Sequence, residues 1–168
     1  MVIVLMGVSG SGKTTIGKLL SKRTDIPFFD GDDFHPDINV EKMAKGTPLT
    51  DQDRVAWIEQ IADFIKGSPA EHKILACSAL SKFVRGLIIK GIKESCYFVF
   101  LKGGYGLIKE RMNSREKHYM KSVMLASQFE ALEEPEGALI ISVENSPDQI
   151  CDAIHNAIGE DVEIKYNP

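Results

Sequence analysis

Short apolar runs alternate with longer segments of helical periodicity along the whole chain. The runs at residues 2–6, 27–30, 73–78, 96–101 and 138–143 have the length and composition of strands. Strands that alternate with helices in this way predict a five-stranded parallel α/β sheet with helices on both faces. A chain of 168 residues without an internal repeat or a linker has room for one well-buried core. We therefore expect a single domain over residues 1–168.

Two of the predicted helices begin with a capping box. Thr50 precedes the first of these helices, and Asp53 follows three residues later. Ser146 and Gln149 have the same spacing at the start of the last helix, where Pro147 takes the first helical position. Each box marks the start of a helix with one apolar face. The expected core residues are Val55, Ile58, Ala62 and Ile65 in the first helix and Ile150, Ala153, Ile154 and Ala157 in the last.

Composition and charge limit the classes of molecule that the protein is expected to bind. The net charge is −4 and no long stripe of Lys and Arg occurs, which argues against nucleic acid and favours a small-molecule substrate. No apolar run approaches the roughly 20 residues of a membrane span, and the first strand leaves no room for a targeting segment, so we expect a cytoplasmic protein without membrane contact. Cys77, Cys96 and Cys151 are odd in number and lack a C-x-x-C spacing, so we expect reduced thiols that pack in the fold.

The first predicted strand runs directly into a glycine-rich loop, residues 7–14, which matches the P-loop pattern G-x-x-x-x-G-K-[ST]. Such a loop turns its backbone N–H groups toward phosphate oxygens, and the positive end of the following helix adds to the attraction. The lysine supplies a cation, and the last hydroxyl can bind Mg²⁺. A nucleotide is therefore expected here. The residues assigned to its binding are Gly7, Val8, Ser9, Gly10, Ser11, Gly12, Lys13, Thr14 and Thr15.

The second predicted strand leads into two carboxylates, Asp30 and Asp32, at the edge of the sheet where ligands of open α/β folds bind. We expect Asp30 to serve the metal ion, because the third strand carries no terminal aspartate. Asp32 is suited to take the proton of an acceptor hydroxyl during phosphoryl transfer. Asp33 is interpreted as ordinary surface charge. His35, which precedes a proline, either closes the turn or contacts the ligand, and both interpretations stay open.

Three cations lie near the starts of predicted helices, where positive charge is disfavoured by about 0.3–1 kcal/mol each. They are Arg54, Lys82 and Arg85. An anion nearby would reverse that sign, and a carboxylate on the acceptor suits the planar fork of Arg. The alternative is an ordinary surface pair, such as Arg54 with Asp51. Trp57, one turn after Arg54, either lines the acceptor pocket or packs in the core, and we favour the core.

The polar segment 113–128 predicts a lid. Arg111 and Arg115 stand four residues apart at its start, and such a like-charge pair costs a few tenths of a kcal/mol on a free helix. The phosphates of ATP would offset this cost. A short mobile segment that carries Arg over the phosphates excludes water and stabilises developing charge. The alternative is a plain surface loop.

Taken together, ordered blocks of residues resemble the gluconokinases, P-loop kinases related to the shikimate and nucleoside-monophosphate kinases. The resemblance runs from the first strand to about residue 143. It implies ATP-dependent phosphorylation of D-gluconate at its 6-hydroxyl, a three-layer P-loop NTPase fold with a small lid, and a homodimer. The blocks are residues 5–14, 30–32 with 35–36, 39–43, 46–51 with 53–54 and 57, 77–80 with 82 and 85, and 127–133 with 135.

The resemblance also implies roles for residues at matching positions. Thr14 and Asp30 would hold Mg²⁺, Arg111 would flank the nucleotide, and the catalytic group would comprise Lys13, Asp32 and Arg115. Arg54 and Arg85 would face the substrate carboxylate, by analogy with the shikimate kinases. The full set implied for substrate binding is Asp32, His35, Arg54, Ser78, Lys82, Arg85 and Gln128.

The same residues are compatible with two other functions. The acceptor could be shikimate or another aldonate instead of D-gluconate. A nucleotide-dependent switch is the competing class, but the N-K-x-D segment with which guanine-specific switches read the base does not occur in the sequence. The chain departs from the family pattern at Gln52, Gly104 and Lys117, and Lys117 stands where a glycine commonly precedes the lid histidine. This last departure bears on lid closure and leaves the P-loop intact.

Overall fold

A computed structural model describes residues 1–114 and 119–159 and contains one sheet of five parallel strands. The strand order is β2-β3-β1-β4-β5, so the first strand of the chain lies at the centre. Each strand predicted from the sequence is present, and no strand end differs from the prediction by more than two residues. The strands are β1 (Val2–Met6), β2 (Phe28–Asp30), β3 (Lys73–Ala76), β4 (Cys96–Lys102) and β5 (Leu139–Ser142).

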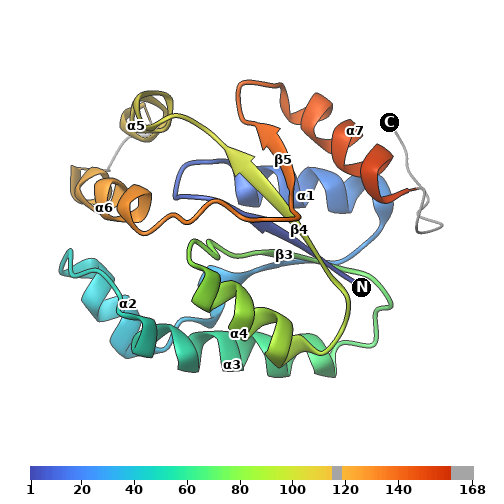
Figure 1. Ribbon diagram of the computed structural model, residues 1–168, viewed down its shortest axis with the longest axis horizontal. Coiled ribbons are helices and arrows are strands. Elements are labelled where there is room, and N and C mark those ends of the chain that lie inside the picture. The colour runs from blue at the N-terminus through green and yellow to red at the C-terminus, as the bar shows by residue number, and fades with distance from the viewer. Residues whose placement is uncertain (115–118, 160–168) are drawn as a thin grey trace.

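Helices cover both faces of this sheet and confirm the three-layer α/β prediction (Figure 1). Helices α1 (Lys13–Thr24) and α7 (Pro147–Ile158) pack on one face, and α3 (Asp51–Gly67) and α4 (Lys82–Ile92) pack on the other. Helices α5 (Tyr105–Asn113) and α6 (Tyr119–Glu130) lie side by side beyond the sheet. The remaining elements are the short 3₁₀ helix η1 (Gly31–Phe34) and helix α2 (Asp37–Ala44).

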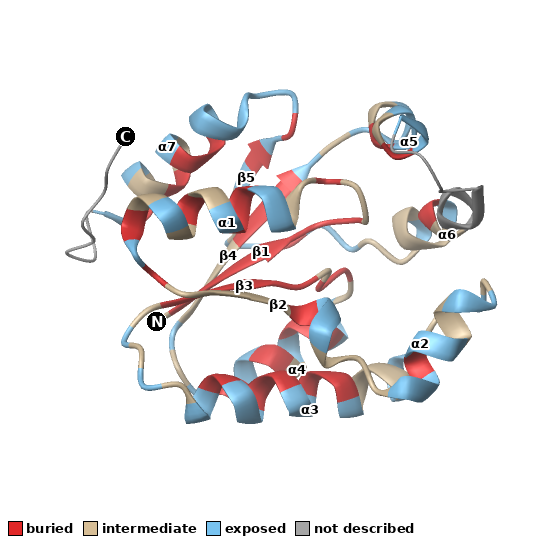
Figure 2. Ribbon diagram, turned by 180° about the vertical axis from the view of Figure 1, so that it is seen from behind, coloured by how far each residue is buried: buried red, intermediate tan, exposed pale blue. Residues whose placement is uncertain are grey.

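The alternation of side chains along β1 divides the core in two. Ile3 and Leu5 join the cluster under α1 and α7, whereas Val2, Val4 and Met6 join the cluster under α3 and α4. All of β1 is buried, as the red central strand in Figure 2 shows. A strand packed on both faces is rigid. The loop that follows Met6 therefore starts from a fixed point.

Both predicted capping boxes are present, at Thr50 with Asp53 and at Ser146 with Gln149. The core faces agree with the sequence in part, because a helix buries a stripe wider than a strict repeat suggests. In α3, three of the expected residues are buried and Val55 is only partly buried. In α7, the buried residues are Ile150, Cys151, Ile154 and Ile158, whereas Ala153 and Ala157 are partly exposed.

Helix α1 approaches the edge strand β2 unusually closely at Gly17. A Cβ atom on Gly17 would lie 2.2 Å from a ring carbon of Phe28, so only glycine leaves room for the aromatic ring. The ring of Phe28 thus packs directly on the helix backbone. This contact sets the distance between α1 and β2, two elements that lead into or out of the predicted phosphate site.

The amino-terminal ends of the inner strands are held by a partly buried ion pair. Lys73 Nζ, on a side chain that is 4% exposed, donates to the two carboxylate oxygens of Glu94 at 2.9 and 3.2 Å. The amino group of Met1 lies 3.4 Å from the same carboxylate. Burial raises the pKa of Glu94, but the hydrogen bond and charge of Lys73 and the amino group outweigh it, so the net shift is downward.

The three cysteines are free thiols, as predicted. Burial raises the pKa of Cys77 to about 12 and those of Cys96 and Cys151 to about 11, so the thiols are protonated and unreactive at neutral pH. In the part of the chain that the structure describes, no helix is long and apolar enough to cross a membrane.

Candidate active site

The glycine-rich loop between β1 and α1 has a backbone that requires its glycines. Gly7 has φ +141°, and a Cβ atom there would lie 2.9 Å from the carbonyl oxygen of Leu101. Gly12 has φ +96° and is the N-cap of α1, so the cap residue has no side chain to bond the first N–H groups of the helix. Those N–H groups and the positive end of the helix are available to an anion.

Lys13 folds back over this loop. Its Nζ donates to the carbonyl oxygens of Gly7 at 2.9 Å and Val8 at 3.1 Å. Burial lowers the pKa of Lys13, and the negative charges of Asp32 and Asp30 oppose that shift. The ammonium group is therefore bonded to the phosphate loop and interacts with the negative charges of Asp30 and Asp32.

The loop also holds an unsatisfied hydroxyl. Ser11 is 2% exposed, and its Oγ atom has no hydrogen-bond partner among the described residues. A buried hydroxyl without a partner costs about 1–3 kcal/mol, which a ligand can recover. The loop thus offers a polyphosphate three kinds of partner. They are the N–H groups at the start of α1, the ammonium group of Lys13 and the hydroxyl of Ser11.

Thr14 and Asp30 meet at the mouth of the loop. Thr14 Oγ1 donates to Asp30 Oδ2 at 2.7 Å, which brings the end of β2 to the start of α1. A hydroxyl and a carboxylate are oxygen ligands of the kind that Mg²⁺ prefers. The pair assigned to the metal ion from the sequence is thus together, and its chemistry fits that ion.

The turn after β2 carries Asp32, the carboxylate predicted to serve the acceptor. The Asp30 side chain accepts from the backbone N–H of Asp32 at 3.2 Å and so begins η1. Asp32 is exposed, and its Oδ1 lies 3.9 Å from His35 Nε2. Burial lowers the pKa of His35; the charge of Asp32 opposes that shift and the charge of Arg54 adds to it. The imidazole is therefore neutral at pH 7.

Trp57 of α3 contacts this turn through both its N–H group and its ring. Its ring is 2% exposed, and Nε1 donates to the carbonyl oxygen of Gly31 at 2.7 Å. The indole also stacks on the imidazole of His35, with ring centroids 4.1 Å apart and planes 17° apart. The core position that we favoured from the sequence is confirmed. The contact with the turn is one that sequence reasoning missed, because no local spacing relates residue 57 to residue 31.

A cavity of about 470 Å³ lies between α3, α4 and the end of α6. Arg54, Ser78 and Lys82 line it together with the acidic residues Asp51, Glu130 and Glu133. The carbonyl oxygen of Ser78 accepts from the backbone N–H of Gly7 at 3.2 Å, so one wall of the cavity adjoins the phosphate loop. Three residues implied for the substrate are thus brought together beside the predicted donor site.

The cations around this cavity have partners within the protein. Arg54 pairs with Asp51 at 3.1 Å, as in the alternative interpretation from the sequence, and Lys82 pairs with Glu136 at 3.2 Å. The carboxylate of Glu133 accepts from the backbone N–H of Lys82 and complements the start of α4. The positions of these cations are therefore explained without a ligand. Arg85 is buried, and its Nη1 donates to the carbonyl oxygens of Ala79 at 2.9 Å and Leu80 at 3.0 Å.

Two residues expected near the nucleotide can be placed only in part. Arg111, near the end of α5, donates from Nη2 to the carbonyl oxygen of Val143 at 2.7 Å, just after β5. Arg115 lies outside the described residues, as does Lys117. The predicted lid, 113–128, therefore begins at the end of α5 and includes most of α6.

Gln128 of α6 is bonded to the phosphate loop itself. Its Oε1 accepts from the backbone N–H of Ser9 at 2.6 Å, and its Nε2 donates to Ser9 Oγ at 3.0 Å. The family resemblance placed Gln128 among substrate-binding residues. The structure shows it tied to the donor loop, in a position that only the match of residues 127–133 could suggest.

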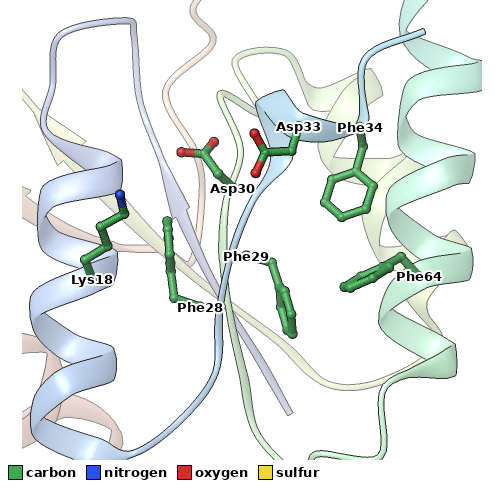
Figure 3. Close-up of a pocket in the computed structure, with 7 residues that line it drawn as sticks. All are labelled: Lys18, Phe28, Phe29, Asp30, Asp33, Phe34 and Phe64. Carbon is green, nitrogen blue, oxygen red and sulfur yellow. The ribbon is translucent and has the colours of Figure 1, made fainter.

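A second cavity, of about 440 Å³, lies on the outer side of β2 (Figure 3). The carboxylate groups of Asp30 and Asp33 both lie at its upper edge, and Lys18 of α1 reaches toward Asp30. Asp33 is exposed, as predicted. The remaining wall is aromatic and consists of Phe28, Phe29, Phe34 and Phe64.

Comparison with known proteins gives the family. The shikimate kinase family model matches residues 9–157. The chain is 43% identical to the thermosensitive gluconokinase of Escherichia coli K12 over 79% of its own length and 72% of that protein, and 40% identical to the gluconokinase of Arabidopsis thaliana over 99% and 95%. The crystal structure of a gluconokinase from Sinorhizobium meliloti 1021 superposes with a TM-score of 0.85 at 35% identity, covering 96% and 93% of the two chains. The chain belongs to the gluconokinase family of P-loop kinases.

Proposed function

We propose that this protein transfers the γ-phosphoryl group of ATP to the 6-hydroxyl of D-gluconate. The observation that carries the proposal is the position of Lys13, which lies on the phosphate loop within the electrostatic reach of both Asp30 and Asp32. A donor loop, a metal-side carboxylate and an acceptor-side carboxylate therefore share one site. The relatives named gluconokinases, 40% and 43% identical to this chain, support D-gluconate as the acceptor.

Each residue of the donor half has a part in this reaction. The backbone of residues 7–14 binds the phosphates, and Lys13 leaves the loop carbonyls to neutralise charge on them. Thr14 and Asp30 would hold Mg²⁺, which neutralises further phosphate charge when bound. Asp32 takes the proton of the attacking hydroxyl as the new O–P bond forms and the bond to the leaving phosphate breaks. Arg111 flanks the nucleotide.

The acceptor half is assigned to the cavity beside Ser78. Arg54 and Lys82 would exchange their present partners, Asp51 and Glu136, for the carboxylate of the substrate. Exposed ion pairs are worth about 0–1 kcal/mol, so this exchange costs little. The Nδ1 atom of His35 is buried and has no hydrogen-bond partner among the described residues, so a substrate hydroxyl could bond to it only after the turn moves.

Two further substrate residues act through the backbone. Arg85 holds the carbonyl groups of Ala79 and Leu80, and Leu80 lines the cavity. Gln128 orders Ser9 in the donor loop. The contacts of both residues support indirect roles in substrate binding.

Four further parts complete the proposal. They are the use of Mg²⁺, a homodimer, a location in the cytoplasm, and one kinase domain in which segment 113–128 acts as a lid that carries Arg115 over the phosphates. The contact of Gln128 with Ser9 supports the lid, because it joins this segment to the phosphate loop.

A coupled assay of ADP release tests the proposed reaction. Folded protein with ATP, Mg²⁺ and D-gluconate should release ADP far faster than the same mixture without an acceptor. A panel with shikimate and other aldonates should show strong preference for D-gluconate, because a pocket that pairs with hydroxyl groups rejects analogues that lack them. Turnover no faster than the ATP-only background would contradict the proposal, and preference for another acid would change its acceptor.

A further inference from the structure

Trp57 holds both ends of the turn on which Asp32 stands. Its N–H group donates to the carbonyl oxygen of Gly31, directly before Asp32, at 2.7 Å. Its ring stacks on His35, three residues after Asp32, at 4.1 Å between centroids. Asp32 itself is exposed, so little else packs against its side chain. The position of this carboxylate therefore depends on how its turn is held.

The same turn is pressed against the sheet at Gly31. A Cβ atom on this residue would lie 2.6 Å from the carbonyl oxygen of Ala76, at the end of β3. The turn thus has β3 on one side and the indole on the other. Both supports are rigid, because Trp57 is 2% exposed and Ala76 is 1% exposed.

Helix α3 connects this support to the acceptor cavity. Arg54, which lines that cavity, lies three residues before Trp57, so the two side chains project from the same side of the helix. A displacement of α3 would move Arg54 and the turn of Asp32 together. One helix therefore sets the distance between the residue assigned to the substrate carboxylate and the residue assigned to the reacting hydroxyl.

We propose that Trp57 is a positioning residue for phosphoryl transfer, which places Asp32 through its contacts with Gly31 and His35. The inference rests on the proposed function, because it takes Asp32 as the group that accepts the proton. A misplacement of about 1 Å can cost a factor of about 100 in rate, so small shifts of the turn are sufficient. Nucleotide binding, which depends on the P-loop backbone, should not respond.

A double-mutant cycle tests the inference. Trp57→Phe keeps an aromatic ring on His35 but removes the N–H group, and we expect kcat to fall about tenfold with an unchanged KM for ATP. In the Asp32→Asn background the same substitution should change kcat by less than about twofold, because Trp57 then has no base to place. Ile65→Val, a buried change on the same helix away from the turn, should leave kcat unchanged in both backgrounds.

Gly31→Ala is a second variant that leaves the indole intact. It pushes the turn away from Ala76, and its effect on kcat should likewise disappear in the Asp32→Asn background. Thermal melting followed by circular dichroism shows whether each variant is folded at the assay temperature. If Trp57→Phe and Gly31→Ala each lower kcat by the same factor in the Asp32→Asn background as in the original chain, the inference is overturned. Near-normal turnover of Asp32→Asn alone would instead contradict the proposed role of Asp32, so the two failures are distinct.

Discussion

The donor and acceptor halves of the site differ in how their polar groups are satisfied. In the donor half, Lys13 bonds to carbonyl groups of its own loop, and the hydroxyl of Ser11 is buried without a partner in the described structure. In the acceptor half, Arg54 and Lys82 already form ion pairs with acidic side chains. The donor site is thus built by the backbone before any ligand arrives, whereas acceptor binding at Arg54 and Lys82, as proposed, would require an exchange of partners.

The largest effect is expected where the two halves meet. Asp32→Asn should lower kcat by about two to four orders of magnitude, because an amide cannot take the proton of the acceptor hydroxyl. The affinity for ATP, measured by calorimetry, should barely change. Asp33→Asn is the matched control, since Asp33 is also exposed on the same turn but lines the outer cavity. Equal losses for the two variants would show that turn charge, not a base, is responsible.

Removal of an acceptor cation should have a smaller effect that is confined to one substrate. Arg54→Leu is expected to raise the KM for D-gluconate about 10–100-fold, the loss of a charged hydrogen-bonded pair, with little change in the KM for ATP. Asp51→Asn removes the present partner of Arg54 and should lower the KM for D-gluconate a few-fold. A raised KM in Asp51→Asn would mean that the pair itself shapes the pocket.

The donor half can be perturbed from outside at Gly17. Gly17→Ala should displace Phe28 and with it Asp30, so the Mg²⁺ concentration for half-maximal activity should rise about tenfold. Phe28→Leu in the same chain should restore part of the loss, because the smaller side chain makes room for the methyl group. Gly86→Ala in α4 is the control, since a Cβ atom there would meet nothing within 4 Å. Equal Mg²⁺ requirements in the two alanine variants would contradict the prediction that Gly17 affects the position of Asp30.

The smallest effect is expected at the amino-terminal ends of the inner strands, where neither half of the site is present. Glu94→Gln should lower the free energy of unfolding by about 1 kcal/mol at neutral pH, because Lys73 loses its charged partner. The folded pKa of Glu94 is below its usual value of 4.5, so this stabilisation is present above that value and disappears as the pH falls through the folded pKa. Urea unfolding at about pH 7 and about pH 3 should show the difference from the original chain shrinking in acid. A kcat for Glu94→Gln that differs from that of the original chain would show that these strand ends are coupled to the site.

The sequence predicted those features that depend on neighbouring residues. Alternating periods gave the five parallel strands, and fixed spacings gave the two capping boxes. The meeting of Thr14 with Asp30 was also predicted, because parallel strands bring their carboxyl ends to one edge of the sheet. Backbone geometry and topology are sufficient for such inferences.

Contacts between side chains far apart in the chain could not be predicted in this way. The acidic partners of Lys82 are Glu133 and Glu136, which lie about fifty residues later in the chain. Because this distant contact is not visible in the local sequence, the unfavourable position of Lys82 at a helix start suggested an external anion. Gln128 reaches Ser9 across 119 residues. These contacts depend on how distant elements pack, which a short sequence pattern does not predict.

Trp57 also provides a spectroscopic probe, because it is the single tryptophan of the chain. Its indole is bonded to Gly31 and stacked on His35, so its emission arises from the turn beside the reacting groups. The chain therefore carries a native fluorophore at the junction of its donor and acceptor halves. Binding of D-gluconate and of ATP can be followed separately in the unlabelled protein, each through the quenching or spectral shift that it produces at one site.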